Sequence, residues 1–308
     1  MQTILGSGGA IGTHLATELY KFTTNIRLVS RHPKAVNSTD QLMAIDLTSR
    51  NHIFKAVEGS EIVYVTIGFP YRTKIWEKLW PSFIHNVINA CKFYKARLVF
   101  FDNMYMYGDK YMSRMTEETP IEPCCKKGKV RAKVAEKVTR EFEKAEIDVL
   151  IARAPDFLAL HNGVLAQTIY ANLKKGKKAI CLASDSHKRN VILPSIAAKA
   201  TALLGNTPDA YNQVWHLPSS HEALTGKEWT ELFASELNCK PKHQTISPFM
   251  ISILGLFAPV MKEFKEMMYQ YTQDYFFDSS KFENRFQFKH VSVTEAVKIM
   301  ITEDQLPK

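Results

Sequence analysis

The stretch Gly6-Ser7-Gly8-Gly9-Ala10-Ile11-Gly12 decides the fold of this chain, because it joins an apolar run at residues 3–5 to a helical pattern over 11–22. It contains G-x-x-G-x-x-G between a predicted strand and a predicted helix. In that context glycines let backbone amides approach a pyrophosphate, and the helix N-terminus adds partial positive charge. The residues predicted to bind the phosphates of a dinucleotide are Gly6, Gly8, Gly9, Ala10, Ile11 and Gly12. A glycine-rich turn without a ligand is the alternative.

Outward from this loop, short β-rich runs alternate with longer helical patterns, which is typical of a parallel sheet covered by helices on both faces. The predicted strands are 3–5, 26–29, 42–45, 61–65, 97–101 and 148–151, and helical periodicity covers 11–22, 75–94 and 130–145. The second half is less regular, but capping boxes that begin at Thr225 and Ser292 predict helices near 226–237 and 293–301.

These patterns predict a Rossmann-type, doubly wound α/β fold with a smaller C-terminal substrate lobe. Residues 1–155 form the predicted NAD(P)-binding domain, completed by parts of 178–220. Residues 156–308 mainly form the predicted substrate-binding lobe.

Composition excludes several classes of protein. With 308 residues, 45% of them hydrophobic and 23% charged, the chain is not a disordered, collagen-like or disulfide-scaffold protein. The net charge of +9 favours anionic partners, but does not by itself separate nucleotide cofactors from nucleic acid or membrane. Five cysteines without zinc-type spacing indicate a reducing compartment and no metal.

Targeting signals are not evident in the sequence. The start of the chain reaches the glycine cluster within five residues, which is too short for a signal peptide. The most apolar stretch, 246–261, is shorter than the ~20 residues that span a bilayer and contains two prolines, so it predicts a core or lid helix. The expected location is cytoplasmic.

The end of the second predicted strand indicates which dinucleotide is preferred. An NAD-selective site usually places a carboxylate there to hold the adenosine ribose, whereas this chain has Ser30 and Arg31. A hydroxyl and a guanidinium suit a 2′-phosphate, so NADP is favoured and NAD is less favoured. The alternative is that Arg31 is a solvated surface charge. Asp46, after the third strand, either accepts from the adenine amino group or caps the next helix.

Three segments then resemble the extended and atypical short-chain dehydrogenase/reductase superfamily, the NAD-dependent epimerases/dehydratases. Residues 99–108 resemble the family's fifth strand, which ends in Tyr-Gly, and 116–123 resemble the acidic, proline-bearing loop that follows. Residues 280–288 and 292–296 resemble its closing segment, although Gln287 and His290 replace the usual Gly and Pro.

The resemblance assigns candidate catalytic positions. The family carries Tyr-x-x-x-Lys on a helix, and the match keeps the Lys as Lys133 but places Lys129 at the Tyr position. The position of the substrate-orienting Ser falls on Asn103. The resemblance also implies that the backbone of Thr66, Ile67 and Gly68 passes under the cofactor, and that Lys133 holds the nicotinamide ribose.

Elementary chemistry leaves two interpretations of these positions. Asn103 can donate to a carbonyl oxygen, and Lys129, one helical turn from Lys133, would have its pKa lowered by that neighbour and could donate a proton. Alternatively, Lys129 belongs to a solvated basic face. One of Tyr105, Tyr107 and Tyr111 could then substitute for the missing Tyr, although such tyrosines more often pack in the core.

The leading functional hypothesis is an NAD(P)-dependent oxidoreductase or epimerase/dehydratase-like protein that acts on a small substrate, with nucleotide-sugars as the candidate class. The alternative is a non-catalytic NADP-binding sensor, favoured by the missing Tyr and the intact loop. Nucleic-acid binding is disfavoured, because no aromatic stacking platform accompanies the basic run. The expected partner is a small molecule, without nucleic acid or membrane, and a homodimer is left open.

Overall fold

The computed structural model describes residues 1–257 and 259–305, and the chain folds into two compact units. The first unit comprises Met1–Met106, Lys127–Ala154 and Pro194–Leu217, and the second comprises Tyr107–Lys126, Pro155–Leu193 and Pro218–Lys308. Residues 107–126, which precede the predicted boundary at 155, group with the second unit. The first unit is therefore assembled from three separate stretches of sequence.

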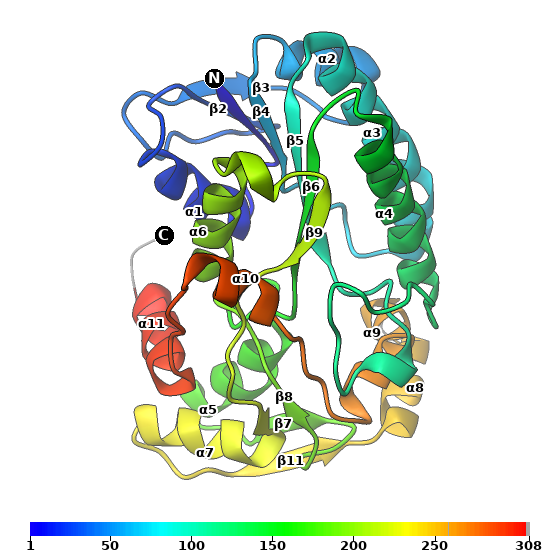
Figure 1. Ribbon diagram of the computed structural model, residues 1–308. Coiled ribbons are helices and arrows are strands. Elements are labelled where there is room, and N and C mark those ends of the chain that lie inside the picture. The colour runs from blue at the N-terminus through cyan, green and yellow to red at the C-terminus, as the bar shows by residue number, and fades with distance from the viewer. Residues whose placement is uncertain (258, 306–308) are drawn as a thin grey trace. The chain divides into compact units, whose positions relative to one another are not determined.

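The first unit is built on one seven-stranded sheet (Figure 1). Its strands are β1 (Gln2–Leu5), β2 (Ile26–Ser30), β3 (Gln41–Ala44), β4 (Ile62–Val65), β5 (Arg97–Asn103), β6 (Val149–Ala154) and β9 (Gln213–His216). They pair in the order β3-β2-β1-β4-β5-β6-β9, and every pair is parallel. The strand order reverses between β1 and β4, where Leu5 pairs with both Val29 and Val65. This arrangement confirms the predicted doubly wound fold.

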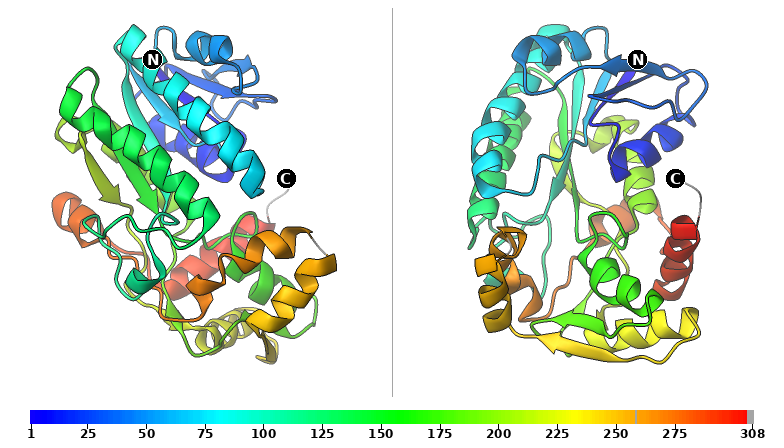
Figure 2. Two further views of the ribbon diagram at one scale, coloured as in Figure 1. Left: turned by 90° about the vertical axis from the view of Figure 1, so that its right-hand side faces the viewer. Right: turned by 180° about the vertical axis from the view of Figure 1, so that it is seen from behind.

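Helices cover both faces of this sheet (Figures 1 and 2). They are α1 (Ala10–Leu19), α2 (Arg50–Val57), α3 (Thr73–Tyr94), α4 (Lys126–Lys144) and α6 (Pro194–Gly205). On one face α1 packs against α6. On the other, α2 packs against α3, and α3 and α4 lie side by side over the sheet.

The side chains of each central strand point alternately to the two faces of the sheet, and this explains why the strands are continuous apolar runs in the sequence. In β4, Val63 and Val65 pack into the large core cluster on the α3 and α4 side. Tyr64, between them, points to the α6 face, where its hydroxyl donates to Gln2 Oε1 at 2.9 Å and accepts from Asn206 Nδ2 at 3.3 Å. Successive side chains thus enter cores on opposite faces, and a strand buried on both faces needs apolar residues at every position.

The second unit contains two small sheets and several helices. Its strands are β7 (Ala179–Leu182), β8 (Lys188–Arg189), β10 (Leu224–Thr225) and β11 (His243–Ile246), which pair as β7 with β11 and β8 with β10. Its helices are α5 (Ala171–Lys174), α7 (Gly226–Glu236), α8 (Pro248–Phe257), α9 (Pro259–Lys265), α10 (Ser280–Phe286) and α11 (Val293–Gln305). Short helical turns lie at Asp109–Tyr111, Ala166–Tyr170 and Met268–Tyr271 in this unit, and at Pro208–Ala210 in the first.

Both predicted capping boxes lie at helix starts. Thr225 Oγ1 accepts from the Glu228 amide at 3.2 Å, and the Glu228 carboxylate accepts from the Thr225 amide at 2.8 Å, so α7 begins as predicted. Ser292 Oγ accepts from the Glu295 amide at 3.2 Å, at the start of α11.

The apolar stretch 246–261 forms two helices, α8 and α9, in place of the single predicted helix, and residue 258 between them lies outside the described residues. Across the described ranges 1–257 and 259–305, none of the helices combines the length and the apolar character needed to cross a bilayer.

Candidate functional site

The glycine loop follows β1 directly, and two of its glycines are required by the protein's own packing. Gly6 has a φ of +103°, and a Cβ built there would lie 2.5 Å from the backbone of Ile67. A Cβ on Gly12 would lie 2.7 Å from both the Gly6 carbonyl oxygen and Ser7 Cα. Because neither glycine has a Cβ, the start of α1 can pack closely against the loop, which is the geometry that a phosphate-binding turn requires.

Gly9 has a different role from Gly6 and Gly12. It is the N-cap of α1 and has ordinary extended backbone (φ −89°, ψ 168°). The nearest atom to a Cβ built there is the Gly6 carbonyl oxygen, at 3.7 Å. Gly8 and Gly9 are exposed. The start of α1 is therefore exposed at its N-cap, and the amides at a helix N-terminus can donate to an anion bound there.

A cavity of about 870 Å³ opens beside this loop, within the size range of small-molecule sites. It is lined by the loops that follow β1, β2, β3 and β4 and by the start of α3: Gly6, Gly8, Gly9, Ser30, Arg31, His32, Ile45, Asp46, Leu47, Thr48, Thr66, Ile67, Gly68, Phe69, Pro70, Lys74, Ile75, Lys78 and Leu79. Nine residues predicted from the sequence are in this lining. Ala10 continues the chain into α1, while Ile11 and Gly12 are buried behind the loop.

The charges around the cavity favour an anionic ligand. Arg31, His32, Lys74 and Lys78 line it together with one carboxylate, Asp46. The two lysines, one turn apart on α3, were not predicted, because nothing in the sequence around them marks a site. They could have been suspected only from their position just after the fourth strand.

Asp46 is held as a carboxylate by its own turn. Its Oδ1 accepts from the Thr48 amide at 2.9 Å, and this hydrogen bond lowers the pKa of Asp46, with smaller contributions from the nearby Arg31 and His52. Helix α2 begins later, with Ser49 as its N-cap. Asp46 therefore does not cap α2, which was one of the two roles considered for it.

Two buried hydroxyls at this site fit a ligand. Among the residues that the structure describes, Ser7 Oγ and Ser30 Oγ have no hydrogen-bond partner although both atoms are buried. Ser30 lines the cavity, and its Oγ lies 3.8 Å from where a Cβ on Gly8 would be. Buried polar atoms are normally satisfied, so an acceptor delivered by a ligand in the cavity would complete Ser30 Oγ. The residues present therefore fit a bound dinucleotide.

Asn103 lies at the carboxyl end of β5, where its Oδ1 accepts from the Tyr105 amide at 3.1 Å. The preceding residue, Asp102, is fully buried and accepts from the Asn103 amide at 2.9 Å. Its carboxylate also pairs with two buried guanidiniums, accepting from Arg131 Nε at 3.0 Å and from Arg153 at 3.3 Å. This charge cluster fixes the strand end that carries Asn103.

The two predicted lysines of α4 lie on its exposed face. Lys129 and Lys133 are both exposed, whereas Lys127 and Arg131, with the same four-residue spacing, are buried. Lys127 Nζ donates to Thr73 Oγ1 at 3.2 Å and lies 4.5 Å from the centre of the Tyr71 ring. None of these four residues is among those that line the cavity described above. The catalytic roles of Lys129 and Lys133 stay predictions.

The burial of Lys127 and Arg131 was not predicted from the sequence, because a helix rich in lysine is normally interpreted as solvent-exposed. The signal that could have found it is the apolar row of α4: Val130, Val134 and Val138 are buried, and the two cations share this face at three- and four-residue steps.

Tyr105, Tyr107 and Tyr111 differ in their surroundings. Tyr107 is fully buried, and its hydroxyl donates to the Thr116 carbonyl oxygen at 3.0 Å. Tyr105 stacks on Trp76, with ring centres 6.2 Å apart. Lys110 lies 4.9 Å from the ring centre of Tyr111. Tyr105 and Tyr107 thus have the packing role considered for them.

A parallel sheet in this strand order, with a glycine loop and a basic cavity at the point where the order reverses, defines a Rossmann-type nucleotide-binding protein. The model of the NAD dependent epimerase/dehydratase family matches residues 3–213. The chain belongs to this family, which confirms the resemblance drawn from the sequence. Family membership supports a nicotinamide dinucleotide as the cofactor.

Solved structures share the fold across the whole chain. A UDP-glucuronic acid 4-epimerase from Bacillus cereus, solved in complex with NAD, is 14% identical with a TM-score of 0.76, covering 98% of this chain and 99% of its own. MoeE5 in complex with UDP-glucose and NAD is 16% identical with a TM-score of 0.78, covering 99% and 98%. A partial consensus L-threonine 3-dehydrogenase is 16% identical with a TM-score of 0.79, covering 99% of both chains. A search of curated protein sequences finds none that matches.

Proposed function

We propose that this protein binds NADP and catalyses an oxidoreduction, epimerisation or dehydration of a small substrate of the nucleotide-sugar class. The observation that supports NADP most directly is the end of β2, where Ser30, Arg31 and His32 line the cavity and no carboxylate occupies the position that selects NAD. The substrate class is proposed from family membership and from the UDP-sugar enzymes that share the fold.

A bound nicotinamide would supply or accept a hydride, and the chain's own residues would hold the cofactor and the substrate. The amides at the start of α1 would donate to the pyrophosphate. Ser30 Oγ and the Arg31 guanidinium would bind the 2′-phosphate, with Lys74 and Lys78 adding positive charge to the same cavity. The Asp46 carboxylate would accept from the adenine amino group.

Proton transfer would involve Asn103 and one lysine of α4. Asn103, fixed at the end of β5, would donate to the substrate oxygen. Lys129 would move the proton and Lys133 would hold the nicotinamide ribose, as the family resemblance implies. The buried pair Lys127 and Arg131 offers the same spacing on the other face of α4, so Lys127 is the second candidate for the proton-transferring group.

A non-catalytic NADP sensor remains the second candidate function. The observation in its favour is chemical: the family's catalytic Tyr position on α4 carries a lysine here, whether Lys129 or Lys127 is taken as its match, whereas the glycine loop is intact.

The cofactor proposal is tested by calorimetric titration of NADPH and NADH into the unmodified protein and into Arg31→Asp. NADPH should bind more tightly, and loss of the charge-assisted contact in the variant should cost about 1.5–3 kcal/mol, or roughly ten- to a hundredfold in affinity. Lys34→Asp is the matched control, because it makes the same charge change at an exposed position three residues later that does not line the cavity. Equal affinities of the unmodified protein for the two cofactors would refute the NADP assignment.

The catalytic proposal is tested by measuring cofactor-dependent turnover of UDP-glucose and UDP-glucuronic acid by Lys129→Met, Lys127→Met and Lys133→Met. Loss of the proton-transferring lysine should lower the rate ~10²-fold or more with NADP affinity nearly unchanged. Lys133→Met should instead weaken cofactor binding. An active enzyme indifferent to Lys129→Met but disabled by Lys127→Met would move the role to the buried face of α4. A protein that binds NADP tightly and turns over neither substrate would favour the sensor.

A further inference from the structure

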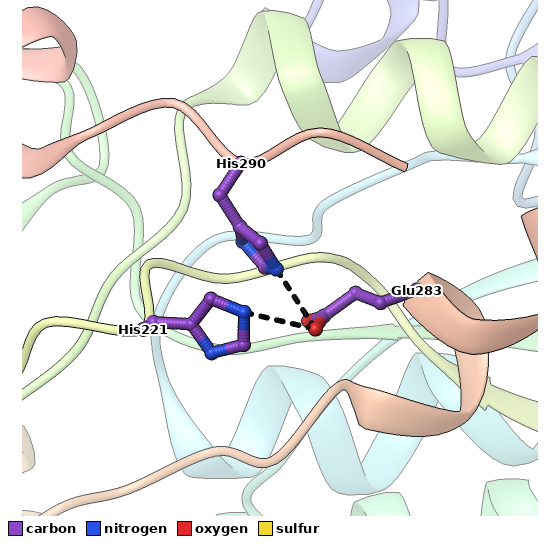
Figure 3. Close-up of side chains that lie close together, drawn as sticks. All are labelled: His221, Glu283 and His290. Carbon is purple, nitrogen blue, oxygen red and sulfur yellow. Dashed lines mark ion pairs between the residues drawn. The ribbon is translucent and has the colours of Figure 1, made fainter. Parts of the chain in front are cut away.

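Two histidines and one glutamate meet in the second unit, where His221 approaches Glu283 and His290 from a distant part of the sequence (Figure 3). His221 Nε2 lies 3.1 Å and His290 Nε2 lies 2.8 Å from the same oxygen, Oε2 of Glu283. The two imidazole rings are 3.5 Å apart between centres and inclined by 55°. All three potential ligand atoms lie within 4.8 Å of one another. None of these residues lines the cofactor cavity or belongs to the first unit.

Each residue comes from a different segment. His221 lies in the segment before β10, Glu283 lies on α10, and His290 lies in the segment that leads to α11. A search for ligand spacing along the sequence could not find this group, because the two histidines are far apart and only the folded chain brings them together. The sequence-based expectation of no metal rested on spacing alone.

A buried hydrogen-bond network orients the glutamate. Glu283 Oε1 accepts from Ser279 Oγ at 2.5 Å, and Ser279 Oγ in turn accepts from the Ser219 amide at 3.1 Å. Asn190, which is fully buried, donates to Ser219 Oγ at 3.0 Å. One carboxylate oxygen is therefore tied into the core, and the other is presented to the two imidazoles. Partners of this kind orient metal ligands and fix their rotamers.

The nitrogen of His290 is incompletely satisfied by Glu283. Although the two atoms are 2.8 Å apart, the direction of approach does not make a hydrogen bond, and the buried Nε2 has no hydrogen-bond partner within residues 1–257 and 259–305. A carboxylate between two imidazoles either accepts two N–H groups or shares a cation with two ring lone pairs. The geometry at His290 favours the shared cation.

We propose that His221, Glu283 and His290 bind a divalent transition metal, with Zn²⁺ as the best-matched ion. Two imidazole nitrogens and one carboxylate oxygen are ligands that Zn²⁺ takes in tetrahedral sites, at about 2.0–2.2 Å, so that neighbouring ligand atoms lie roughly 3.3 Å apart. The two nitrogen-to-oxygen distances are close to this spacing, and small side-chain rotations would complete it. The His221 side chain is 59% exposed, which leaves a fourth position open to water.

This ion would join the segments of His221, Glu283 and His290 within the second unit, of which the serine network links only the first two. Binding to the folded state alone stabilises that state by mass action, so Zn²⁺ should raise the thermal stability of the second unit. The inference goes beyond the proposed function, because it needs neither cofactor nor turnover.

The test is calorimetric titration of Zn²⁺ into the untagged, chelator-treated full chain. One ion should bind per chain with a dissociation constant at or below about 10 µM. His221→Ala and Glu283→Gln should each weaken binding ~100-fold or more, whereas Ser279→Ala, which keeps all three ligands, should weaken it ~10-fold. The Glu283→Gln side chain can still accept from Ser279, so this variant should fold. Co²⁺ bound at the same site should give the visible absorption of a tetrahedral nitrogen and oxygen ligand set.

Two control variants separate this site from other metal-binding groups. His187→Ala removes a partly exposed histidine elsewhere in the second unit and should leave the affinity unchanged. Cys124→Ser removes an exposed thiol that could bind Zn²⁺ by itself and should also have no effect. Unchanged far-UV circular dichroism would show that each variant is folded. The proposal is overturned if the folded, unmodified protein binds no Zn²⁺ at about 100 µM, or if binding persists in both His221→Ala and Glu283→Gln.

Discussion

Gly9, the N-cap of α1, and Gly12, in the first turn of that helix, should cause different defects when each is replaced by valine. At Gly12 a Cβ would lie 2.7 Å from two atoms of the loop backbone, so Gly12→Val must displace the loop or the start of α1. Overpacking of this kind costs about 1–3 kcal/mol, which corresponds to a fall of roughly 2–12 °C in melting temperature for a domain of 150–250 residues.

Gly9→Val should leave the fold nearly unchanged. The backbone at Gly9 is extended, which valine adopts readily, and the nearest atom to the new Cβ is 3.7 Å away. The cost should be limited to the poorer N-cap, up to about 1 kcal/mol. The valine side chain would extend from the exposed N-cap of α1 into the position where the pyrophosphate is proposed to bind. Dinucleotide affinity should fall at least ~100-fold, or about 2.7 kcal/mol.

The assay combines thermal unfolding by circular dichroism with calorimetric titration of NADPH on the same preparations. Gly9→Val should bind NADPH much more weakly but keep its melting temperature. Gly12→Val should show both a lower melting temperature and weaker binding of NADPH. If Gly9→Val binds NADPH within about threefold of the unmodified protein, the pyrophosphate does not lie against the start of α1 and the placement of the cofactor is wrong.

Two further predictions concern buried charge and thiol chemistry. Asp102→Ala leaves the buried guanidiniums of Arg131 and Arg153 without their shared carboxylate and should lower the free energy of unfolding by about 3–5 kcal/mol, measured by urea denaturation; a loss below about 1 kcal/mol would contradict the buried ion pairs. A hydrogen bond with the adjacent Cys125 thiol lowers the pKa of Cys124 to about 7, so its alkylation by iodoacetamide should rise with pH and level off above about pH 8 as the thiolate becomes the main form. Peptide mapping should show the exposed Cys239 reacting more slowly at pH 7, and equal rates would contradict the prediction.

Sequence reasoning found the first six strands of the sheet because each is a short apolar run bounded by turns and helices. It missed β9, since Gln213–His216 joins the sheet only by pairing with β6, far away in sequence. It also missed α2 and α6. Helix α2 has only eight residues, whereas α6 is rich in alanine and buried on most sides, so its pattern has little amphipathic contrast.

The candidate site was predictable to the extent that it lies in loops after strands. Gly6, Ser30 and Thr66 lie at the ends of neighbouring strands of the sheet, and parallel strands bring their carboxyl ends to one edge. Charged residues on helices were harder to place. Which cations of α4 are buried depends on their partners, Tyr71 for Lys127 and Asp102 for Arg131, which only the tertiary structure identifies.

The three-part composition of the first unit has a consequence for synthesis of the chain on the ribosome. A nascent chain that has emerged only as far as residue 155 holds β1 to β6 but lacks α6 and β9. Until residue 217 has emerged, β6 lacks its neighbour β9 and stays at the edge of the sheet, and the face occupied by Tyr64 lacks α6, one of the two helices that pack there. Residues 155–193, which group with the second unit, must be made in between. Fragments that end before α6 should therefore be prone to aggregation, and we expect the first unit to complete its fold only after residue 217 has been made.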